Sequence, residues 1–177
     1  MISNELSGFV RNIKDFPKQG IMFRDITTLL KEPKALNKTL ELLFEKAEIA
    51  APTKVAGIES RGFIFGGMLA NRLNVGFIPI RKPGKLPAKT ISQTYELEYG
   101  TDKLEIHEDA VQPGDRILIH DDLLATGGTA LAACSLVEKL GGIVVQNSFI
   151  IELSFLNGRS KLRSYDVVSL INYSSEE

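Results

Sequence analysis

Apolar residues follow two different spacings along the chain. Helical spacing predicts helices over residues 33–50, 62–73 and 128–140. Short, nearly uninterrupted apolar runs predict buried strands over residues 54–58, 75–80, 116–120 and 143–151. Because strands and helices follow each other in turn, the predicted fold class is α/β, with a mostly parallel sheet flanked by helices.

Two segments depart from this alternation. Residues 15–30 are apolar without a clean period, and we interpret residues 1–33 as a small hood added to the sheet. Residues 94–107 alternate apolar and polar side chains around Gly100, which predicts a β-hairpin within a projecting flap of about residues 83–107. Length gives no reason for a further division, so we expect a single domain over residues 1–177.

Composition and charge argue against several kinds of partner. The 177 residues are 44% hydrophobic and carry a formal net charge of −1, with acids and bases interspersed. Such a surface offers no overall basic field for nucleic acid or for an anionic membrane, and no segment has the ~20 apolar residues of a membrane helix. Cys134 is the only cysteine and the first residues do not resemble a secretory signal, so we expect a cytoplasmic protein. Cys134 shares one predicted helical face with Ala130 and Val137, so we interpret it as a packed residue and not a nucleophile. His120 is assigned no functional role.

An acidic pair precedes a glycine-rich loop at the end of the predicted strand over residues 116–120. Asp121 and Asp122 are followed by LATGGT, which leads into a predicted helix whose free amides suit a phosphate. The lysine of a nucleoside triphosphate loop is missing, and the acid of a dinucleotide site would follow the glycines. A ligand with its phosphate on the loop would direct ribose hydroxyls to the carboxylates, with Mg²⁺ shared between sugar and phosphate. Either half alone is more typical of a helix cap or a plain turn, but the combination favours a sugar-phosphate site.

A basic cluster follows the predicted strand over residues 75–80. The stretch RKPGKLP contains Arg81, Lys82 and Lys85. By itself such a run is usually a solvated loop. At the same sheet edge as a phosphate loop, it favours a clamp for a second anion.

The stretch ILIHDDLLATGGTA resembles the phosphoribosyl pyrophosphate signature of the type I phosphoribosyltransferases. Further stretches resemble, in order and spacing, the members of this family that use adenine: DFPKQGIMFRDITTLL, GIESRGFIFG, IPIRKPGKLP, YELEYG and IELSFLNGR. The resemblance covers nearly the whole chain. It implies the type I fold, a homodimer, and Mg²⁺-dependent transfer of phosphoribosyl from phosphoribosyl pyrophosphate to adenine, giving AMP and pyrophosphate in purine salvage.

The resemblance also implies roles for individual residues. On the donor side, it implies that phosphoribosyl pyrophosphate is bound by Asp121, Asp122, Ala125, Thr126, Gly127, Gly128, Thr129, Arg81, Lys82 and Lys85. Within this set, Arg81 could reach the site of a neighbouring subunit. On the acceptor side, it implies adenine contacts from Met22, Phe23, Arg61 and Leu153. Because Arg61 lies between a predicted strand and a predicted helix, a structural ion pair or a helix-edge contact is the alternative for it. The phenyl ring and the leucine would sandwich the purine and the main chain near Met22 would accept from its amino group, with core packing as the alternative for these three residues.

Two glutamates compete for the role of proton acceptor on the flap. Glu96 and Glu98 share a face of the predicted strand, so their spacing alone does not choose between them. The resemblance selects Glu98, with Tyr99 beside it, as the group that takes or holds the purine proton while N9 attacks the ribose. It assigns no residue as a direct metal ligand and implies Mg²⁺ bound mainly through the substrate, near Asp121 and Asp122.

Three other functions remain as alternatives. Transfer to xanthine or another purine would use the same donor half of the site. A regulator that only senses the donor would normally carry a DNA-binding appendage with a basic face, for which the chain has neither spare length nor charge. A structural sugar-phosphate binder would need neither Glu98 nor the basic cluster.

Overall fold

The computed structural model describes residues 2–96 and 100–176, so Glu98 and Tyr99 lie outside the described residues. The strands are β1 (Arg11–Lys14), β2 (Met22–Asp25), β3 (Lys54–Ile58), β4 (Gly76–Ile80), β5 (Thr90–Glu96), β6 (Thr101–His107), β7 (Arg116–Leu124), β8 (Ile143–Leu153) and β9 (Val167–Tyr173). The helices are α1 (Ile2–Ser7), α2 (Thr27–Leu30), α3 (Pro33–Ala50), α4 (Gly62–Leu73) and α5 (Gly128–Lys139), with the 3-10 turns η1 (Ser154–Leu156) and η2 (Gly158–Leu162).

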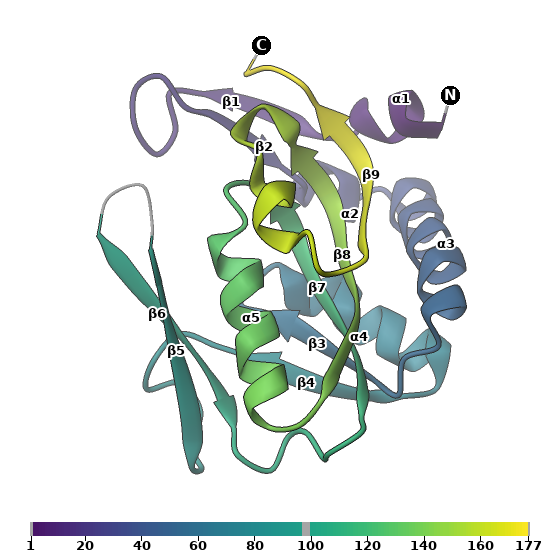
Figure 1. Ribbon diagram of the computed structural model, residues 1–177. Helices are drawn as coiled ribbons and strands as arrows, with labels where there is room; N and C mark the ends of the chain where they lie inside the picture. The colour runs from purple at the N-terminus through teal and green to yellow at the C-terminus, as the bar shows by residue number, and fades with distance from the viewer. Residues whose placement is uncertain (1, 97–99, 177) are drawn as a thin grey trace.

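The central sheet is parallel and has the strand order β4-β3-β7-β8-β9 (Figure 1). The chain enters this sheet at β3, moves outward to β4, and then crosses back to β7 on the other side of β3. Such a reversal is the switch point of an open α/β sheet, where ligands bind beyond the carboxyl ends of the strands. The residues after β3 and those at the end of β7 therefore meet at the place where a ligand is expected.

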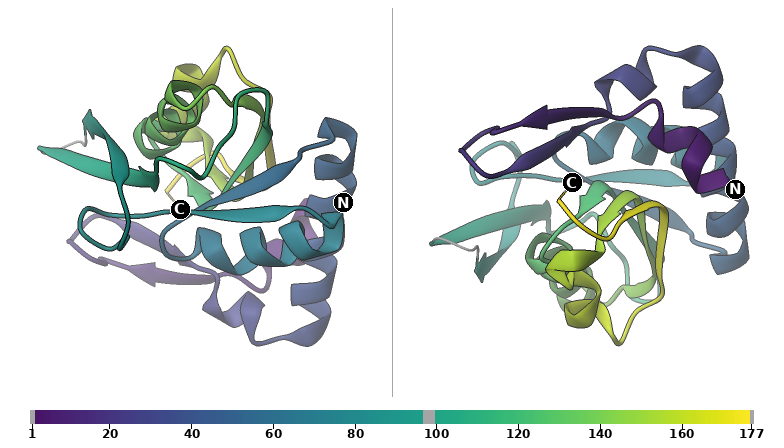
Figure 2. Two further views of the ribbon diagram at one scale, coloured as in Figure 1. Left: turned by 90° about the horizontal axis from the view of Figure 1, so that it is seen from below. Right: turned by 90° about the horizontal axis from the view of Figure 1, so that it is seen from above.

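Helices cover both faces of the sheet, as the views from below and from above show (Figure 2). The cluster under α5 includes Ile117 and Ile119 of β7, whereas the cluster under α3 and α4 includes Leu118 of the same strand. Successive residues of β7 thus enter two different buried layers, which explains why its sequence is an uninterrupted apolar run. In the described part of the chain, no helix combines the length and the apolar character needed to cross a membrane.

The α3 helix shows how local sequence sets the element boundaries. Its N-cap residue Glu32 accepts a hydrogen bond from the amide of Lys34 at 3.4 Å. Pro33 occupies the first helical position, where the missing amide hydrogen costs no helical hydrogen bond. The helix ends at Ala50, and the left-handed φ of 46° at the C-cap residue Ala51 stops the helical repeat.

Two antiparallel hairpins are added to the sheet. β1 and β2 form the hood hairpin, and β5 and β6 form the flap hairpin. Figure 1 shows the hood above the carboxyl ends of β7 and β8 and the flap projecting to one side. A backbone bridge between Arg81 and Glu105 joins the end of β4 to β6, which fixes the base of the flap beside the switch point.

The sequence-based elements are confirmed in position and type, including the hairpin over residues 94–107. The strand predicted over residues 116–120 is longer, because Asp121, Leu123 and Leu124 also pair with β8. The acidic pair is consequently part of β7 instead of following it. The hood hairpin and β9 were not predicted from the sequence.

Candidate active site

The glycine-rich loop between β7 and α5 forms one wall of a cleft. Gly127 has a φ of 78°, a left-handed conformation that favours glycine, and α5 begins at the next residue. The first amides of a helix have no partner within it and carry the positive end of its dipole, so they suit an anion. A cavity of about 190 Å³ lies at this loop, lined by Ala125, Thr126, Gly127 and Thr129 together with Arg61, Asp121 and Asp122.

Asp121 and Asp122 lie side by side in this cleft. Oδ1 of Asp121 accepts a hydrogen bond from the amide of Asp122 at 2.9 Å. Oδ2 of Asp122 lies 2.7 Å from Nε of Arg61, and the Asp122 side chain is 5% exposed. Burial raises the pKa of both carboxyl groups; the charge of Asp122 raises that of Asp121 further, and the Arg61 charge opposes the rise at Asp122. Poorly solvated carboxylates of this kind gain most from a ligand that donates hydroxyl groups or brings a cation.

The start of α4 lies directly against the acidic pair. Gly62 approaches β7 so closely that a Cβ atom at this position would stand 2.7 Å from the carbonyl oxygen of His120. This approach brings Arg61 within reach of Asp122. A second cavity of about 420 Å³ is lined by Glu59, Ser60, Lys82 and Tyr95, among others, and it shares Arg61, Asp121, Asp122 and Thr129 with the first cavity. The two cavities therefore form one cleft across the switch point.

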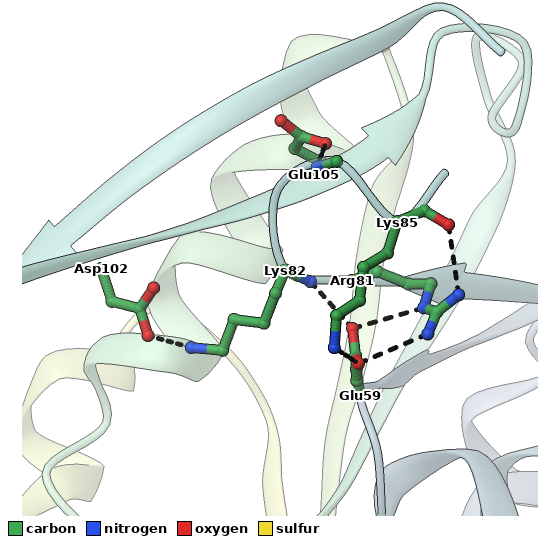
Figure 3. Close-up of polar contacts among 7 residues, drawn as sticks. Glu59, Arg81, Lys82, Lys85, Asp102 and Glu105 are labelled. Carbon is green, nitrogen blue, oxygen red and sulfur yellow. Dashed lines mark hydrogen bonds and ion pairs between the residues drawn. The ribbon is translucent and has the colours of Figure 1, made fainter. Parts of the chain in front are cut away.

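Glu59, which directly follows β3, organises the basic cluster (Figure 3). Its Oε1 lies 2.5 Å from Nζ of Lys85, and its Oε2 accepts from the amide of Lys82 at 2.9 Å and from Nε of Arg81 at 3.3 Å. Burial raises the pKa of Glu59, but these hydrogen bonds outweigh it and lower the pKa to about 2. Two of the three predicted cations, Arg81 and Lys85, thus share this one carboxylate.

Lys82 points the opposite way from Arg81 and Lys85, as Figure 3 shows. Its ammonium group is paired with Asp102 of β6 and donates to the hydroxyl of Tyr95 on β5 at 3.0 Å. Of the basic cluster, Lys82 lines the cleft beside the acidic pair, whereas Arg81 and Lys85 are not among the lining residues. The geometry therefore makes Lys82 the cation best placed for a second anion in this cleft.

Only some of the residues predicted to contact a purine lie close to one another. The guanidinium of Arg61 lies 5.0 Å from the ring centroid of Phe23, which brings the hood next to the cleft. Leu153 ends β8 and is 9% exposed. Met22, at the start of β2, lines a separate cavity with Ile21 and Glu176. Arg61 is the residue that connects the hood to the acidic pair.

Sequence reasoning missed Glu59 and Asp102. Glu59 lies in a stretch that was singled out, GIESRGFIFG, immediately after a predicted strand and so at the expected sheet edge. Position alone could have marked it as a site residue. Asp102 carried no such signal, because its contact with Lys82 joins two segments that pattern analysis treats separately.

Other sequence-based interpretations can be placed in the fold. Gly128 does not line the cleft at the loop; a Cβ atom there would stand 3.0 Å from the carbonyl oxygen of Glu96 on the flap. Cys134 is fully buried and burial raises its pKa to about 12, which confirms the packing interpretation. His120 is buried as well, and burial lowers its pKa to about 4. Glu98 and Tyr99 lie outside the described residues.

Replacing Glu59 with glutamine should reduce stability in a pH-dependent way. The folded pKa of about 2 lies below the ordinary 4.5, so the carboxylate stabilises the fold fully above pH 4.5 and loses this contribution as pH falls toward 2. We expect Glu59→Gln to lower the free energy of unfolding by about 2 kcal/mol at pH 7 and by much less at pH 3. Urea unfolding at both pH values measures this difference. Glu105→Gln is the control, since its carboxylate accepts from the amide of Gly84 in the same segment; an equal loss at both pH values for Glu59→Gln would contradict the assignment.

Comparison with known proteins agrees with this geometry. A family model described as the phosphoribosyl transferase domain matches residues 25–171. The adenine phosphoribosyltransferase of Christiangramia forsetii is 56% identical over 170 residues, covering 96% of this chain and 99% of the relative. The crystal structure of adenine phosphoribosyltransferase from Thermoanaerobacter pseudethanolicus superimposes with a TM-score of 0.94 at 56% identity, covering 96% of this chain and 99% of that one.

A more distant structure is informative about ligands. The Saccharomyces cerevisiae adenine phosphoribosyltransferase, complexed with D-2,5-dideoxy-2,5-imino-altritol 1,6-bisphosphate and adenine, has a TM-score of 0.91 at 40% identity and covers 96% of this chain and 98% of its own. That protein thus holds a sugar bisphosphate analogue together with the purine. On sequence, fold and cleft alike, the chain belongs to the phosphoribosyltransferase family, within the group of the adenine phosphoribosyltransferases.

Proposed function

We propose that the chain transfers the 5-phosphoribosyl group from phosphoribosyl pyrophosphate to adenine, giving AMP and pyrophosphate, and so salvages adenine. The observation that carries the proposal is the single cleft in which Asp121 and Asp122 lie between the glycine-rich loop and Lys82. Such a cleft presents anion sites on both sides of a diol site, which is the order of groups in the donor. The high identity to relatives named adenine phosphoribosyltransferase supports adenine as acceptor.

On the donor side, each group has a partner of suitable chemistry. The 5-phosphate would accept from the amides of residues 125–129, and the ribose hydroxyls would donate to the acidic pair. As pyrophosphate leaves, positive charge develops on the ribose and negative charge on the leaving group. Lys82 stabilises the leaving group, provided that it exchanges Asp102 for pyrophosphate. Arg81 and Lys85 would support this side of the cleft through Glu59, and Arg81 would alternatively reach the site of a neighbouring subunit.

The oxygen ligands of the acidic pair suit a divalent cation. Asp121 and Asp122 supply hard carboxylate oxygens beside the position of the diol, and burial raises the pKa of both carboxyl groups. Among the described residues, no group of three or more His, Cys, Asp or Glu side chains could hold a metal ion by itself. Mg²⁺ would therefore take most of its ligands from the donor, and it would supply charge neutralisation of the leaving pyrophosphate.

The acceptor side would use the hood and the end of β8. Phe23 and Leu153 would enclose the purine, and Arg61 would link it to the acidic pair. Glu98, with Tyr99 beside it, would take the proton that leaves the purine when N9 attacks the ribose. The whole chain would act as one domain in this reaction, and its single cysteine suits a cytoplasmic setting.

An exposed apolar face supports a homodimer. Ile64 on α4 is 40% exposed and Phe77 on β4 is 37% exposed. A hollow of about 470 Å³ is lined by Leu40 of α3 and by Ile64 and Met68 of α4, among others. Arg81 directly follows β4, so a second copy bound here would come close to it. Sedimentation equilibrium measures the predicted dimer, and a monomer at micromolar concentration would contradict it.

The flap glutamates provide a test of the proton acceptor. Glu98→Gln should lower kcat by a factor of about 10²–10⁴ with little change in donor affinity, because a lost general base affects the chemical step. Glu96→Gln is the matched control, two residues earlier in the sequence, and should retain kcat. Steady-state kinetics and donor titration separate the two effects. If both variants turn over at the wild-type rate, Glu98 is not the proton acceptor.

The overall proposal is tested by incubating the protein with phosphoribosyl pyrophosphate, Mg²⁺ and adenine and by measuring AMP and pyrophosphate. Formation of both products in equal amounts is expected. Donor binding without AMP formation would point instead to a sensor or a sugar-phosphate binder.

The double variant Asp121→Asn, Asp122→Asn should lose about 1.5–3 kcal/mol of donor binding per carboxylate.

A further inference from the structure

The residue before Leu153 carries a buried carboxylate that the proposed reaction does not use. Glu152, the next-to-last residue of β8, has a side chain that is 6% exposed. Arg159 donates to it through two nitrogens, from Nε to Oε1 at 2.9 Å and from Nη2 to Oε2 at 2.5 Å. Ser169 of β9 donates to Oε2 at 2.6 Å. These hydrogen bonds lower the pKa of Glu152, so the carboxylate is charged and fully bonded at neutral pH.

Arg159 ties the chain after β8 back to the sheet. Besides Glu152, it donates to the carbonyl oxygen of Val167 in β9 at 2.7 Å. Its segment, the short helical turns that follow β8, appears yellow-green beside the end of the sheet in Figure 1. A planar guanidinium bound at two sites in this way fixes both position and orientation of the turn.

The neighbour of Arg159 is in contact with the phosphate loop. A Cβ atom at Gly158 would stand 2.0 Å from the carbonyl oxygen of Ala125 and 2.9 Å from the amide nitrogen of Gly127. In the opposite direction, a Cβ atom at Gly127 would stand 2.4 Å from the carbonyl oxygen of Gly158. The two backbones therefore touch without an intervening side chain. Any shift of the turn would move the loop.

Glu152 thus occupies the point where three parts of the site converge. It pairs in register with Leu124, the last residue before the loop. It precedes Leu153, the proposed purine contact, and through Arg159 it holds Gly158 against the loop. We propose that Glu152, acting through Arg159, is a positioning residue that sets the separation between the phosphate loop and the purine contact Leu153. The inference rests on the proposed function, because it assigns the two ends of this separation to the phosphate and the base.

This arrangement has a consequence that a purely structural ion pair would lack. AMP engages the phosphate loop and the purine contact at once, whereas adenine and ribose 5-phosphate each engage one end. A change in separation therefore weakens AMP binding without weakening either fragment to the same degree. It also slows the transfer step, since misplacing the reactants by about 1 Å can cost 10²-fold in rate.

The test compares Glu152→Gln with the wild-type protein by calorimetric titration of AMP, adenine and ribose 5-phosphate. We expect AMP affinity to fall about tenfold or more, kcat to fall about 10–100-fold, and each fragment to bind within about threefold of wild type. Arg159→Lys keeps the positive charge but loses the two-pronged contact, and it should show the same pattern to a smaller extent. If Glu152→Gln does not fold, Arg159→Lys decides the question.

Asp115→Asn is the matched control. Asp115 forms a 2.6 Å ion pair with Lys54 immediately before β7, at the edge of the sheet away from the cleft. The Asp115→Asn variant should be less stable than the wild-type protein, but its AMP affinity and kcat should be unchanged. AMP affinity unchanged in Glu152→Gln, or AMP and both fragments weakened equally, would overturn the positioning role. Wild-type AMP formation, measured first, tests the proposed function separately, and the binding titrations do not depend on turnover.

Discussion

Gly127→Ala should abolish measurable donor binding. The φ of 78° at this position is costly for alanine, and the new Cβ atom would stand 2.4 Å from the carbonyl oxygen of Gly158 and 3.1 Å from its carbonyl carbon. Both neighbouring atoms belong to the backbone, so neither can rotate away. The loop must move from its position at the start of α5, and its amides then miss the phosphate. We expect a loss of at least about 10²-fold in donor affinity, measured by calorimetry with phosphoribosyl pyrophosphate and Mg²⁺.

The control variant Gly114→Ala separates the cost of a left-handed φ from the effect of the steric clash. Gly114 has a φ of 87° and lies before β7, and a Cβ atom added there would have no atom of the described residues within 4 Å, apart from its chain neighbours. Alanine there bears the backbone cost of about 1–2 kcal/mol without a clash. Thermal unfolding should therefore show destabilisation in both variants, while donor affinity falls only in Gly127→Ala. Donor affinity at the wild-type level in Gly127→Ala would mean that the loop does not bind the phosphate through its backbone.

The parallel sheet could be predicted because its strands are buried on both faces. Ile117, Leu118 and Ile119 enter opposite layers in turn, and only apolar residues satisfy both. β9 lacks this signal because Ser169 and Asn172 interrupt its apolar residues, and its place in the sheet depends on pairing with β8. The hood hairpin lacks this signal as well, because its short strands are mostly exposed or half-buried.

The sequence predicted those parts of the candidate site whose residues are adjacent in the chain. The acidic pair and the loop are adjacent in sequence, and the fold brings them into one cleft with Arg61. The basic cluster could not be assigned from its sequence alone, because the availability of each cation for an anionic ligand depends on carboxylates that are distant in the chain. Glu59 binds Arg81 and Lys85, while Asp102 binds Lys82. No spacing rule relates these residues, since their contacts arise from packing between β3, β4 and the flap.

Arg61 joins the donor and acceptor sides of the cleft, and it forms an ion pair of the kind that its place between a strand and a helix allows. The resemblance implied a purine contact, and the 5.0 Å separation from the Phe23 ring is compatible with that role. Its 2.7 Å ion pair with Asp122 adds a second role, because the guanidinium favours the charged form of that carboxyl group. Loss of this side chain would therefore affect both substrates, which makes it a poor residue for testing base selectivity alone.

Base selectivity is better tested with the substrates themselves. Adenine carries an amino donor at C6, whereas hypoxanthine, guanine and xanthine carry a carbonyl acceptor there. If the main chain near Met22 accepts from the amino group, an oxopurine would place one acceptor against another. A site built for one hydrogen-bonding partner can reject the wrong one by a factor of about 10⁴ or more. We expect kcat/KM for adenine to exceed that for each oxopurine by this order, measured at equal donor and Mg²⁺ concentrations.

Met22→Leu shows whether main chain or side chain sets this preference. Met22 pairs with Lys14 in the hood hairpin, so its backbone position is fixed by the β1–β2 register and should survive the substitution. Leucine has nearly the same volume, and such swaps usually cost less than about 1.5 kcal/mol in stability. The variant should therefore retain the preference for adenine, with at most a modest change in KM. Efficient turnover of any oxopurine by the wild-type protein would overturn the adenine assignment and leave phosphoribosyl transfer to another purine. A preference lost in Met22→Leu alone would instead assign the selectivity to the side chain.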